Sequence, residues 1–302
     1  MIFCTNKCME VMMRIKEEKN KIIIKDQPDF EPCHIFECGQ AFRWEKQKNN
    51  SYTVVANSKV INVAKEKEDI IISNTNEEDF YNIWQDYFDL NTDYSSIKST
   101  LDTDEIMKTA INFGQGIRIL NQDEFETMIS FIISANNRIP MIKKVIENLS
   151  INFGEKIGEY DGKLYYSFPT YEQLADAPIE IIRDCKAGFR SERIKEAAIR
   201  IIDEKNTVYD LRNKSYDEAL EYLLSYKGVG NKVANCILLF SMKQFSTFPV
   251  DVWVRRVMQE LYVSKMTSDK EIRKFAEDKF GHMSGYAQQY LFYYARENGI
   301  GR

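Results

Sequence analysis

A lysine at an electrostatically awkward position is the first residue with catalytic potential. In the stretch YKGVGNKVANC, residues 226–236, Lys232 stands where a helix is expected to begin. The N-terminal end of a helix already carries partial positive charge, which disfavours a second cation there. The same field favours the uncharged amine, so Lys232 is a candidate nucleophile; the ordinary alternative is a solvated surface lysine. Cys236, four residues on, is expected to share its helix face.

A carboxylate follows further along the chain. In the stretch FPVDVWVRR, Asp251 comes shortly after Pro249 and directly before a helical pattern of apolar residues. Its simplest role is an N-cap that accepts hydrogen bonds from the first turn of that helix. Its catalytic role would be a carboxylate directed at the same site as Lys232. The two roles are compatible, because a cap fixes the direction of the carboxylate.

A helix, a glycine-framed turn and a second helix are expected over residues 215–242. Ser215 and Glu218 form a capping-box pattern that begins the first helix. Gly228 and Gly230 permit unusual backbone angles and close approach by a ligand, and the free N–H groups of the second helix could then hold a phosphate. An ordinary turn between two helices remains the alternative. The expected buried residues are Ala219, Leu220, Leu223 and Leu224 on the first helix and Val233, Ile237 and Phe240 on the second.

Two regions of different periodicity must position these residues. Residues 22–75 contain short β-branched or aromatic runs separated by polar turns, which predict an antiparallel meander. From about residue 78 the apolar residues recur at helical spacing. We therefore expect an α+β protein with an antiparallel β-sheet domain at residues 1–100 and a mainly helical region at residues 101–302. The expected strands lie in KIIIKD, AFRWEKQ, SYTVVAN, KVINVAK and DIIISNT.

Composition narrows the possible classes of protein. The 302 residues are 44% hydrophobic and 13% aromatic, as in globular proteins, and the apolar runs are too short to span a membrane. The N-terminus lacks the apolar core of a signal peptide, so we expect a cytoplasmic protein, associated with the nucleoid if bacterial. Neither a disulfide framework nor a zinc site is expected from six scattered cysteines and two histidines. The net charge of −5 argues mildly against a nucleic-acid partner, although a local basic face is compatible with it.

Several ordered motifs together resemble one enzyme superfamily. The chain carries, in order, CGQAFRW, SANNRIP, GFRSERI, GVGNKVANC, PVDVW and YAQQYLF. GVGNKVANC followed by PVDVW resembles the signature of the helix-hairpin-helix, Gly/Pro-Asp (HhH-GPD) superfamily of DNA glycosylases. The whole set, which covers nearly the entire chain, is similar to the 8-oxoguanine DNA glycosylase branch.

The resemblance implies how the reaction would proceed. Lys232 would attack C1′ of the sugar, displace the damaged base and form a Schiff base that permits strand cleavage. Asp251 would stabilise the positive charge that develops on the sugar. The backbone carbonyl of Gly39 would accept the N7–H that distinguishes 8-oxoguanine from guanine.

The resemblance also implies residues that hold the extruded base and the opened duplex. Gln288 and Phe292 would bind and stack on the base, with Cys236 on its other face; simple core packing is the alternative for the first two. Base extrusion costs a few kcal/mol, and polar and wedging side chains are suited to stabilise the gap. The four residues implied for that task are Asn136 as the plug, Asn137 as its support, Phe189 as a wedge and Arg190 as a contact to the orphaned base. A helix terminus for the asparagines and a core position for Phe189 remain alternatives.

Two positions depart from the pattern of the family. Met141 stands where the animal and fungal enzymes carry an arginine that helps to read the opposite cytosine, and a thioether cannot replace a guanidinium fork. We therefore expect a relaxed preference for the opposite base. Trp253 replaces a histidine implied to contact a phosphate, and its indole N–H is a possible substitute.

Related branches and a different class of protein give alternative functions. The branches with a four-cysteine iron–sulfur cluster are disfavoured because no cysteine follows Cys236, and the alkylation-repair branch is disfavoured by Lys232. A non-catalytic helix-hairpin-helix DNA-binding module would explain the GVG turn but not Lys232 and Asp251 together. The expected partner is thus double-stranded DNA containing 8-oxoguanine. We expect a monomer with no cofactor, metal, iron–sulfur cluster or membrane partner.

Overall fold

A six-stranded antiparallel sheet forms the N-terminal part of the chain. A computed structural model describes residues 13–205 and 207–301; residues 1–12, part of the segment that argued against a signal peptide, lie outside it. The spatial order of the strands is β1-β2-β6-β5-β4-β3. The strands are β1 (Ile15–Glu18), β2 (Lys21–Ile24), β3 (Trp44–Lys46), β4 (Tyr52–Ala56), β5 (Lys59–Glu66) and β6 (Asp69–Ser73).

The predicted meander is correct for only part of this sheet. Strands β3 to β6 are consecutive antiparallel neighbours, but β2 pairs with β6 rather than with β3. The reason is the connection after β2, which contains helix α1 (Pro32–Glu37) and is too long for a hairpin. The sequence also missed β1, whose Ile15 lies opposite Ile24.

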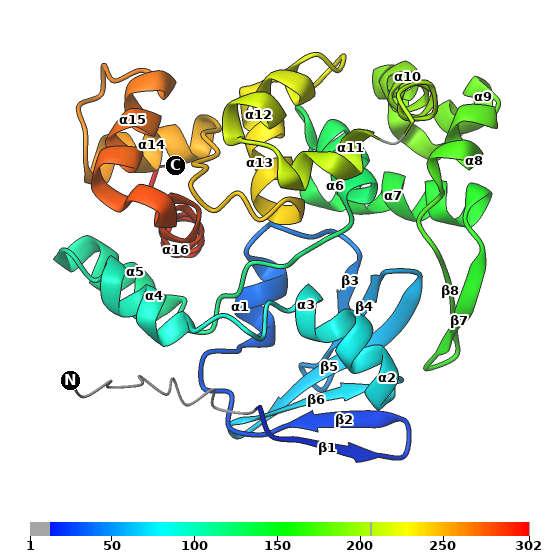
Figure 1. Cartoon of the computed structure of the whole chain (residues 1–302), viewed down its shortest axis with the longest axis horizontal. Coiled ribbons are helices and arrows are strands. Elements are labelled where there is room, and N and C mark those ends of the chain that lie inside the picture. The colour runs from blue at the N-terminus through cyan, green and yellow to red at the C-terminus, as the bar shows by residue number, and fades with distance from the viewer. Residues whose placement is uncertain (1–12, 206, 302) are drawn as a thin grey trace, which may run out of the picture.

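Helices make up most of the remaining chain, which confirms the predicted α+β class. In Figure 1 the helices from α6 onward lie above the sheet, whereas α2 and α3 lie at the level of its strands. Helix α5 packs against α16. The first group is α2 (Glu77–Asp79), α3 (Gln85–Tyr87), α4 (Tyr94–Leu101), α5 (Glu105–Phe113), α6 (Glu124–Ser134), α7 (Ile139–Phe153), α8 (Tyr171–Asp176) and α9 (Ile179–Ile182). The second group is α10 (Ser191–Asp203), α11 (Thr207–Asp210), α12 (Tyr216–Leu224), α13 (Asn231–Ser241), α14 (Val252–Leu261), α15 (Asp269–Phe280) and α16 (Ser284–Asn298).

A β-hairpin that the helical periodicity does not predict interrupts the helical region. Strands β7 (Lys156–Tyr160) and β8 (Lys163–Tyr166) extend from the helices and lie beside the sheet (Figure 1). Tyr165 packs in a small apolar cluster with Val55 and Val60 of the sheet. The hairpin therefore joins the helical region to the sheet.

Two hydrophobic cores stabilise the molecule. One lies between the sheet, α1 and the helical residues 80–88, and includes Ile22, Ile72, Phe36 and Trp84; the other fills the space between the later helices. Burial of an aliphatic or aromatic side chain contributes about 1.5–3 kcal/mol, so these cores supply most of the stabilisation. Within the described residues, no helix is long and apolar enough to cross a membrane.

Candidate active site

The glycine-framed turn leaves the N-terminus of α13 open. Gly228 has a φ of +90°, and a Cβ there would lie 2.5 Å from Cδ of Arg193. Gly230 is the N-cap of α13 and has an ordinary extended conformation, with a φ of −98°. The unusual backbone angles expected from the sequence are therefore found at Gly228 but not at Gly230. A Cβ at Gly230 would meet no atom within 4 Å. Glycine at this position thus leaves the helix end accessible to an anion.

Packing of the two helices largely follows the predicted pattern. Ser215 and Glu218 form the expected capping box at the start of α12. Ala219 and Leu223 are buried, but Leu224 is exposed, so the buried face of α12 is narrower than expected. The predicted stripe on α13, made of Val233, Ile237 and Phe240, is buried.

Lys232 lies on an aromatic surface at the first turn of α13. It is half-buried, and its Nζ is 5.0 Å from the ring centre of Phe131 on α6. The ring of Phe131 in turn stacks on Phe240, with the ring centres 5.6 Å apart. Phe131 was not among the predicted site residues.

The Cys236 thiol lies close enough to both Lys232 and Asp251 for their charges to affect its pKa. Burial raises the pKa of the Cys236 thiol; the charge of Lys232 lowers it, and that of Asp251 raises it. All three residues line one cavity. Asp251 is also the N-cap of α14, and its Oδ1 accepts a hydrogen bond from the Val254 N–H at 2.7 Å. The structure therefore shows the cap and leaves the carboxylate beside the lysine.

The cavity brings together residues from distant parts of the chain. Its volume is about 50 Å³. This volume is smaller than the roughly 150 Å³ of a closed cavity that accommodates benzene. The predicted residues that line it are Gly39, Lys232, Cys236, Asp251, Gln288 and Phe292, and the others are Cys38, Phe131, Phe240, Pro249, Val254 and Gln289.

Gly39 occupies a position that only glycine adopts readily. Its φ is +86°, and a Cβ there would lie 3.3 Å from Cε1 of Phe292. The next residue, Gln40, is fully buried and fixes the loop: its side-chain amide donates to the carbonyls of Ile35 and Arg118 at 2.9 and 2.8 Å, and its oxygen accepts from the Leu120 N–H at 2.8 Å. The orientation of the Gly39 peptide is therefore set by buried hydrogen bonds.

Gln288 and Phe292 face this loop from α16. Gln288 is buried, and its Oε1 accepts a hydrogen bond from Gln289 Nε2 at 2.7 Å. Phe292 is half-buried. Both side chains line the cavity, so their burial reflects a position in its wall.

Arg190 holds the Asn136 turn in place. Its side chain is buried and donates from Nε and Nη2 to the carbonyl of Ala135, at 3.1 and 2.6 Å, and from Nη2 to that of Asn136 at 2.9 Å. Asn136 has a positive φ of +52° in the turn between α6 and α7. Asn137 Nδ2 donates to the carbonyl of Ile133 at 3.2 Å. The two asparagines thus lie at helix termini, and the arginine supports the backbone at Asn136.

Phe189 projects from the surface next to this turn. It is 57% exposed, which excludes the core position considered from the sequence. The guanidinium groups of Arg190 and Arg193 lie 4.3 and 5.1 Å from its ring centre. Arg193 also touches Gly228 and was missed by the sequence analysis. The only available signal was its position in GFRSERI, since its proximity to the hairpin depends on the fold.

The two departures from the family pattern lie in different environments. Met141, near the start of α7, is 42% exposed. Trp253 is half-buried, and its Nε1 is shielded from solvent with no hydrogen-bond partner among the described residues. The suggested phosphate contact of the indole N–H is therefore not supported, because that atom does not reach the surface.

Comparisons with known proteins agree with the motifs. The family model described as 8-oxoguanine DNA glycosylase, N-terminal domain, matches residues 22–128, and that of the HhH-GPD superfamily base excision DNA repair proteins matches residues 129–282. A probable N-glycosylase/DNA lyase of Methanothermobacter thermautotrophicus is 31% identical over 70% of this chain and 74% of its own length. An N-glycosylase/DNA lyase of Saccharomyces cerevisiae is 34% identical over 59% of this chain and 56% of its own.

A solved structure extends the similarity to almost the whole chain. The 8-oxoguanine glycosylase/lyase of Clostridium acetobutylicum, crystallised with double-stranded DNA containing cytosine opposite 8-oxoG, is 49% identical to this chain. The match has a TM-score of 0.92 and covers 95% of this chain and 99% of that one. The resemblance that the motifs indicated is confirmed.

Proposed function

Because the chain belongs to the HhH-GPD superfamily of base excision DNA repair proteins, we propose that it is a DNA glycosylase and lyase that removes 8-oxoguanine from duplex DNA. The observation that carries the proposal is the cavity that Gly39, Lys232, Asp251 and Phe292 line together. Excision of a flipped base requires groups that recognise the base, attack the sugar and stabilise its charge, and an aromatic surface on which the base can stack.

Lys232 is the proposed nucleophile. Its nitrogen forms a bond to C1′ of the sugar while the glycosidic bond breaks, and the electron pair of that bond leaves with the base. Asp251 stabilises the positive charge that develops on the sugar, as preorganised charges do in enzyme active sites. The adduct nitrogen then loses a proton, the C1′–O4′ bond breaks and O4′ takes up a proton, so that the sugar ring opens and C1′ and nitrogen form a Schiff base. Loss of a C2′ proton from this Schiff base leads to β-elimination, which breaks the C3′–O3′ bond of the strand.

The decisive test is borohydride trapping on a duplex that contains 8-oxoguanine. The wild-type protein is expected to form a covalent adduct, because borohydride reduces the Schiff base to a stable amine. Lys232→Gln is expected to lose the adduct and strand cleavage while still binding the duplex. Lys227→Gln is the matched control, since Lys227 lies in the same turn but is paired with Glu196. Tight DNA binding with no wild-type adduct would instead favour a non-catalytic helix-hairpin-helix module.

A relaxed preference for the opposite base is the second part of the proposal. Met141 is exposed beside the Asn136 turn and lacks the hydrogen-bond donors of arginine. Excision rates opposite cytosine, thymine, guanine and adenine are therefore expected to be comparable. Met141→Arg is expected to restore a preference for cytosine of about 1–3 kcal/mol, the value of one good base contact. Strict cytosine dependence of the wild-type rate would refute this part.

The proposal also covers the oligomeric state and the cofactor content of the enzyme. All the residues assigned to the reaction come from one chain, so a monomer without a bound cofactor suffices. Sedimentation of the protein with a single-lesion duplex is expected to show a one-to-one complex.

A further inference from the structure

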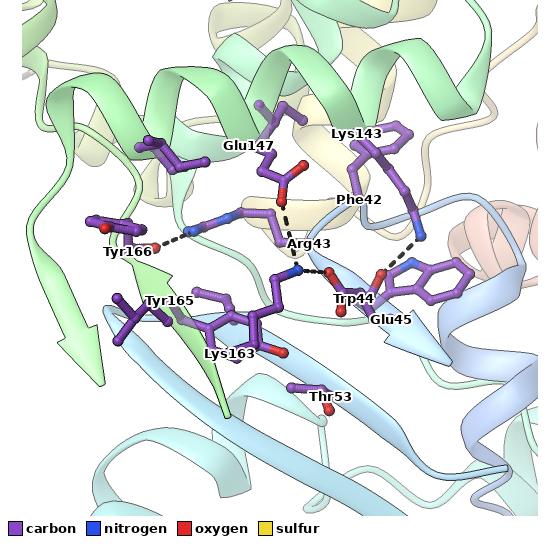
Figure 2. A pocket seen from close by; sticks show the side chains of 15 residues that line it. Phe42, Arg43, Trp44, Glu45, Thr53, Lys143, Glu147, Lys163, Tyr165 and Tyr166 are labelled. Atoms are coloured by element: carbon purple, nitrogen blue, oxygen red, sulfur yellow. Dashed lines mark hydrogen bonds and ion pairs between the residues drawn. The ribbon is translucent and has the colours of Figure 1, made fainter. Parts of the chain in front are cut away.

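A second cavity lies between the sheet, α7 and the β7–β8 hairpin. Figure 2 shows it from close by, with side chains of β3, α7 and β8 around it. Its volume is about 120 Å³, close to the roughly 150 Å³ that admits a benzene ring. The residues that line it are Phe42, Arg43, Trp44, Glu45, Thr53, Val55, Lys143, Ile146, Glu147, Ser150, Ile151, Lys163, Leu164, Tyr165 and Tyr166.

The walls of this cavity are mainly apolar and aromatic. Phe42, Val55, Ile146 and Tyr165 are buried around it. At its rim Ile151 and Leu164 are 49% and 41% exposed, so the apolar lining continues to the surface. Pockets that are lined in this way and hold a few polar groups are typical of small-molecule sites.

Three polar groups that line the cavity have unused hydrogen-bonding capacity, and one of them is Arg43 Nη1, which is buried without a hydrogen-bond partner among the described residues. Ser150 is buried, and its Oγ has no hydrogen-bond partner among the described residues. The Lys143 ammonium is half-buried; it lies 3.1 Å from the ring centre of Trp44 and donates to the Trp44 carbonyl at 2.9 Å. Burial lowers the pKa of Lys143 to about 8, an effect that the charges of Glu45 and Glu37 oppose.

The other cations of the cavity are already paired. Arg43 contacts Glu126 at 3.6 Å and donates to the carbonyl of Tyr166. Lys163 forms ion pairs with Glu45 and with Glu147, the latter at 3.6 Å (Figure 2). Lys143 is therefore the cation of this cavity for which the described residues provide no ion pair.

We propose that this cavity binds a small molecule with one aromatic ring and a carboxylate. The ring would lie against the apolar walls, and the carboxylate would pair with the Lys143 ammonium. An anion would thus give Lys143 the ion pair that the described residues do not provide, whereas a cation would be repelled.

An occupant of this cavity would contact a chain of aromatic rings that leads to the proposed nucleophile. Phe42 lines the cavity and meets Phe131 edge to face, with the ring centres 5.5 Å apart. Phe131 is the ring over which Lys232 lies. A shift of Phe42 would therefore alter the support of Lys232, so the ligand would change the excision rate. This second part rests on the proposed function.

Binding is tested without DNA, by titrating the protein with benzoate, benzyl alcohol and benzylammonium at pH 7 in ligand-observed NMR. We expect saturable binding of benzoate that is at least tenfold tighter than that of the other two. Lys143→Met and Ser150→Leu, checked for native melting, are expected to weaken it at least tenfold. Lys144→Met is the matched control, because Lys144 is exposed on the same helix. The proposed site would be wrong if benzoate showed no saturable binding or if benzylammonium bound as tightly as benzoate. It would also be wrong if Ser150→Leu bound benzoate as tightly as the wild type.

The link to the active site is tested by the rate of borohydride trapping with saturating benzoate. A change of at least twofold is expected for the wild type and none for Lys143→Met. An unchanged wild-type rate would overturn the link alone. Failure of the proposed function would differ from both results, since no adduct would then form at any benzoate concentration.

Discussion

At the scale of single residues, the awkward position of Lys232 is explained by its surroundings. The lysine meets the face of Phe131, and the described residues provide it with no ion pair. Asp251 lines the same cavity but already accepts the Val254 N–H. The amine is therefore left available to a substrate, while the carboxylate is held in a fixed direction.

Gly39 gives a prediction that separates backbone strain from loss of the site. Gly39→Ala is expected to slow excision at least tenfold, because the methyl group would meet Phe292 at 3.3 Å in the wall of the base cavity. Its conformation, with φ at +86°, would add about 1–2 kcal/mol of strain. Single-turnover excision and thermal melting measure the two effects.

The matched control for Gly39 is Gly162→Ala at the tip of the β7–β8 hairpin. Gly162 also has a positive φ, +74°, but a Cβ there would meet no atom within 4 Å. The Gly162→Ala variant is expected to lose about as much stability as Gly39→Ala and to keep the wild-type excision rate. Equal excision by the two variants would show that the contact with Phe292 has no role.

Residue types alone could predict only part of this site. The local patterns around Lys232 and Asp251 predict a nucleophile and a carboxylate, whereas Gly39 is predicted only by the resemblance to the family. Phe131 was missed because a phenylalanine within an apolar helical pattern is indistinguishable from a core residue. Its contact with Lys232 arises only when α6 packs against α13.

At the scale of elements, the residues at turns and helix ends determine which elements could be predicted from the sequence. The β7–β8 hairpin turns at Asp161 and Gly162, both with positive φ, and Asp-Gly between two short strands is a strong hairpin signal. The signal was present but lay within a region of helical periodicity. By contrast, the capping box at Ser215 is a purely local pattern and was predicted correctly.

The Asn136 turn and the segment of Phe189 behave as one element because Arg190 joins them. Arg190→Lys keeps the charge but cannot reproduce the three hydrogen bonds to the carbonyls of Ala135 and Asn136. We expect excision to fall at least tenfold and the salt dependence of DNA binding to stay unchanged. Fluorescence of 2-aminopurine opposite the lesion would report whether the gap is still filled.

Arg183→Lys is the control for the Arg190 experiment. Arg183 is exposed shortly before this segment and pairs with Glu192. That variant is expected to behave as the wild type. A reduced salt dependence in Arg190→Lys would instead indicate that Arg190 binds a phosphate directly.

At the scale of the whole molecule, Arg43 joins the sheet to the helical region. It lies just before β3, forms an ion pair with Glu126 on α6 and donates to the Tyr166 carbonyl on β8. Gln40, a few residues earlier, bonds to Arg118 and Leu120. The loop that carries Gly39 is therefore held by the same junction that joins the two regions. The sequence could predict both regions from their periodicity, but not these contacts, which connect residues far apart in the chain.

The junction also makes stability depend on pH. Burial is the largest influence on Glu126 and raises its pKa to about 7, although Arg43 opposes the shift. An unfolded glutamate ionises near its ordinary pKa of 4.5. Between these values the folded protein holds a proton that the unfolded chain has lost. The stabilisation is therefore complete below pH 4.5 and is lost as the pH rises to about 7.

Glu126→Gln isolates this effect, because glutamine does not titrate. The stability of the wild type relative to Glu126→Gln is expected to fall by about 1–3 kcal/mol from pH 4.5 to pH 7.5, since one pKa unit corresponds to about 1.4 kcal/mol. Urea denaturation at several pH values measures the difference, with the exposed Glu105→Gln as control. A difference that rises with pH would mean that the ion pair with Arg43 outweighs burial. In that case the ionised pair, rather than the protonated carboxyl, would join the sheet to the helices at neutral pH.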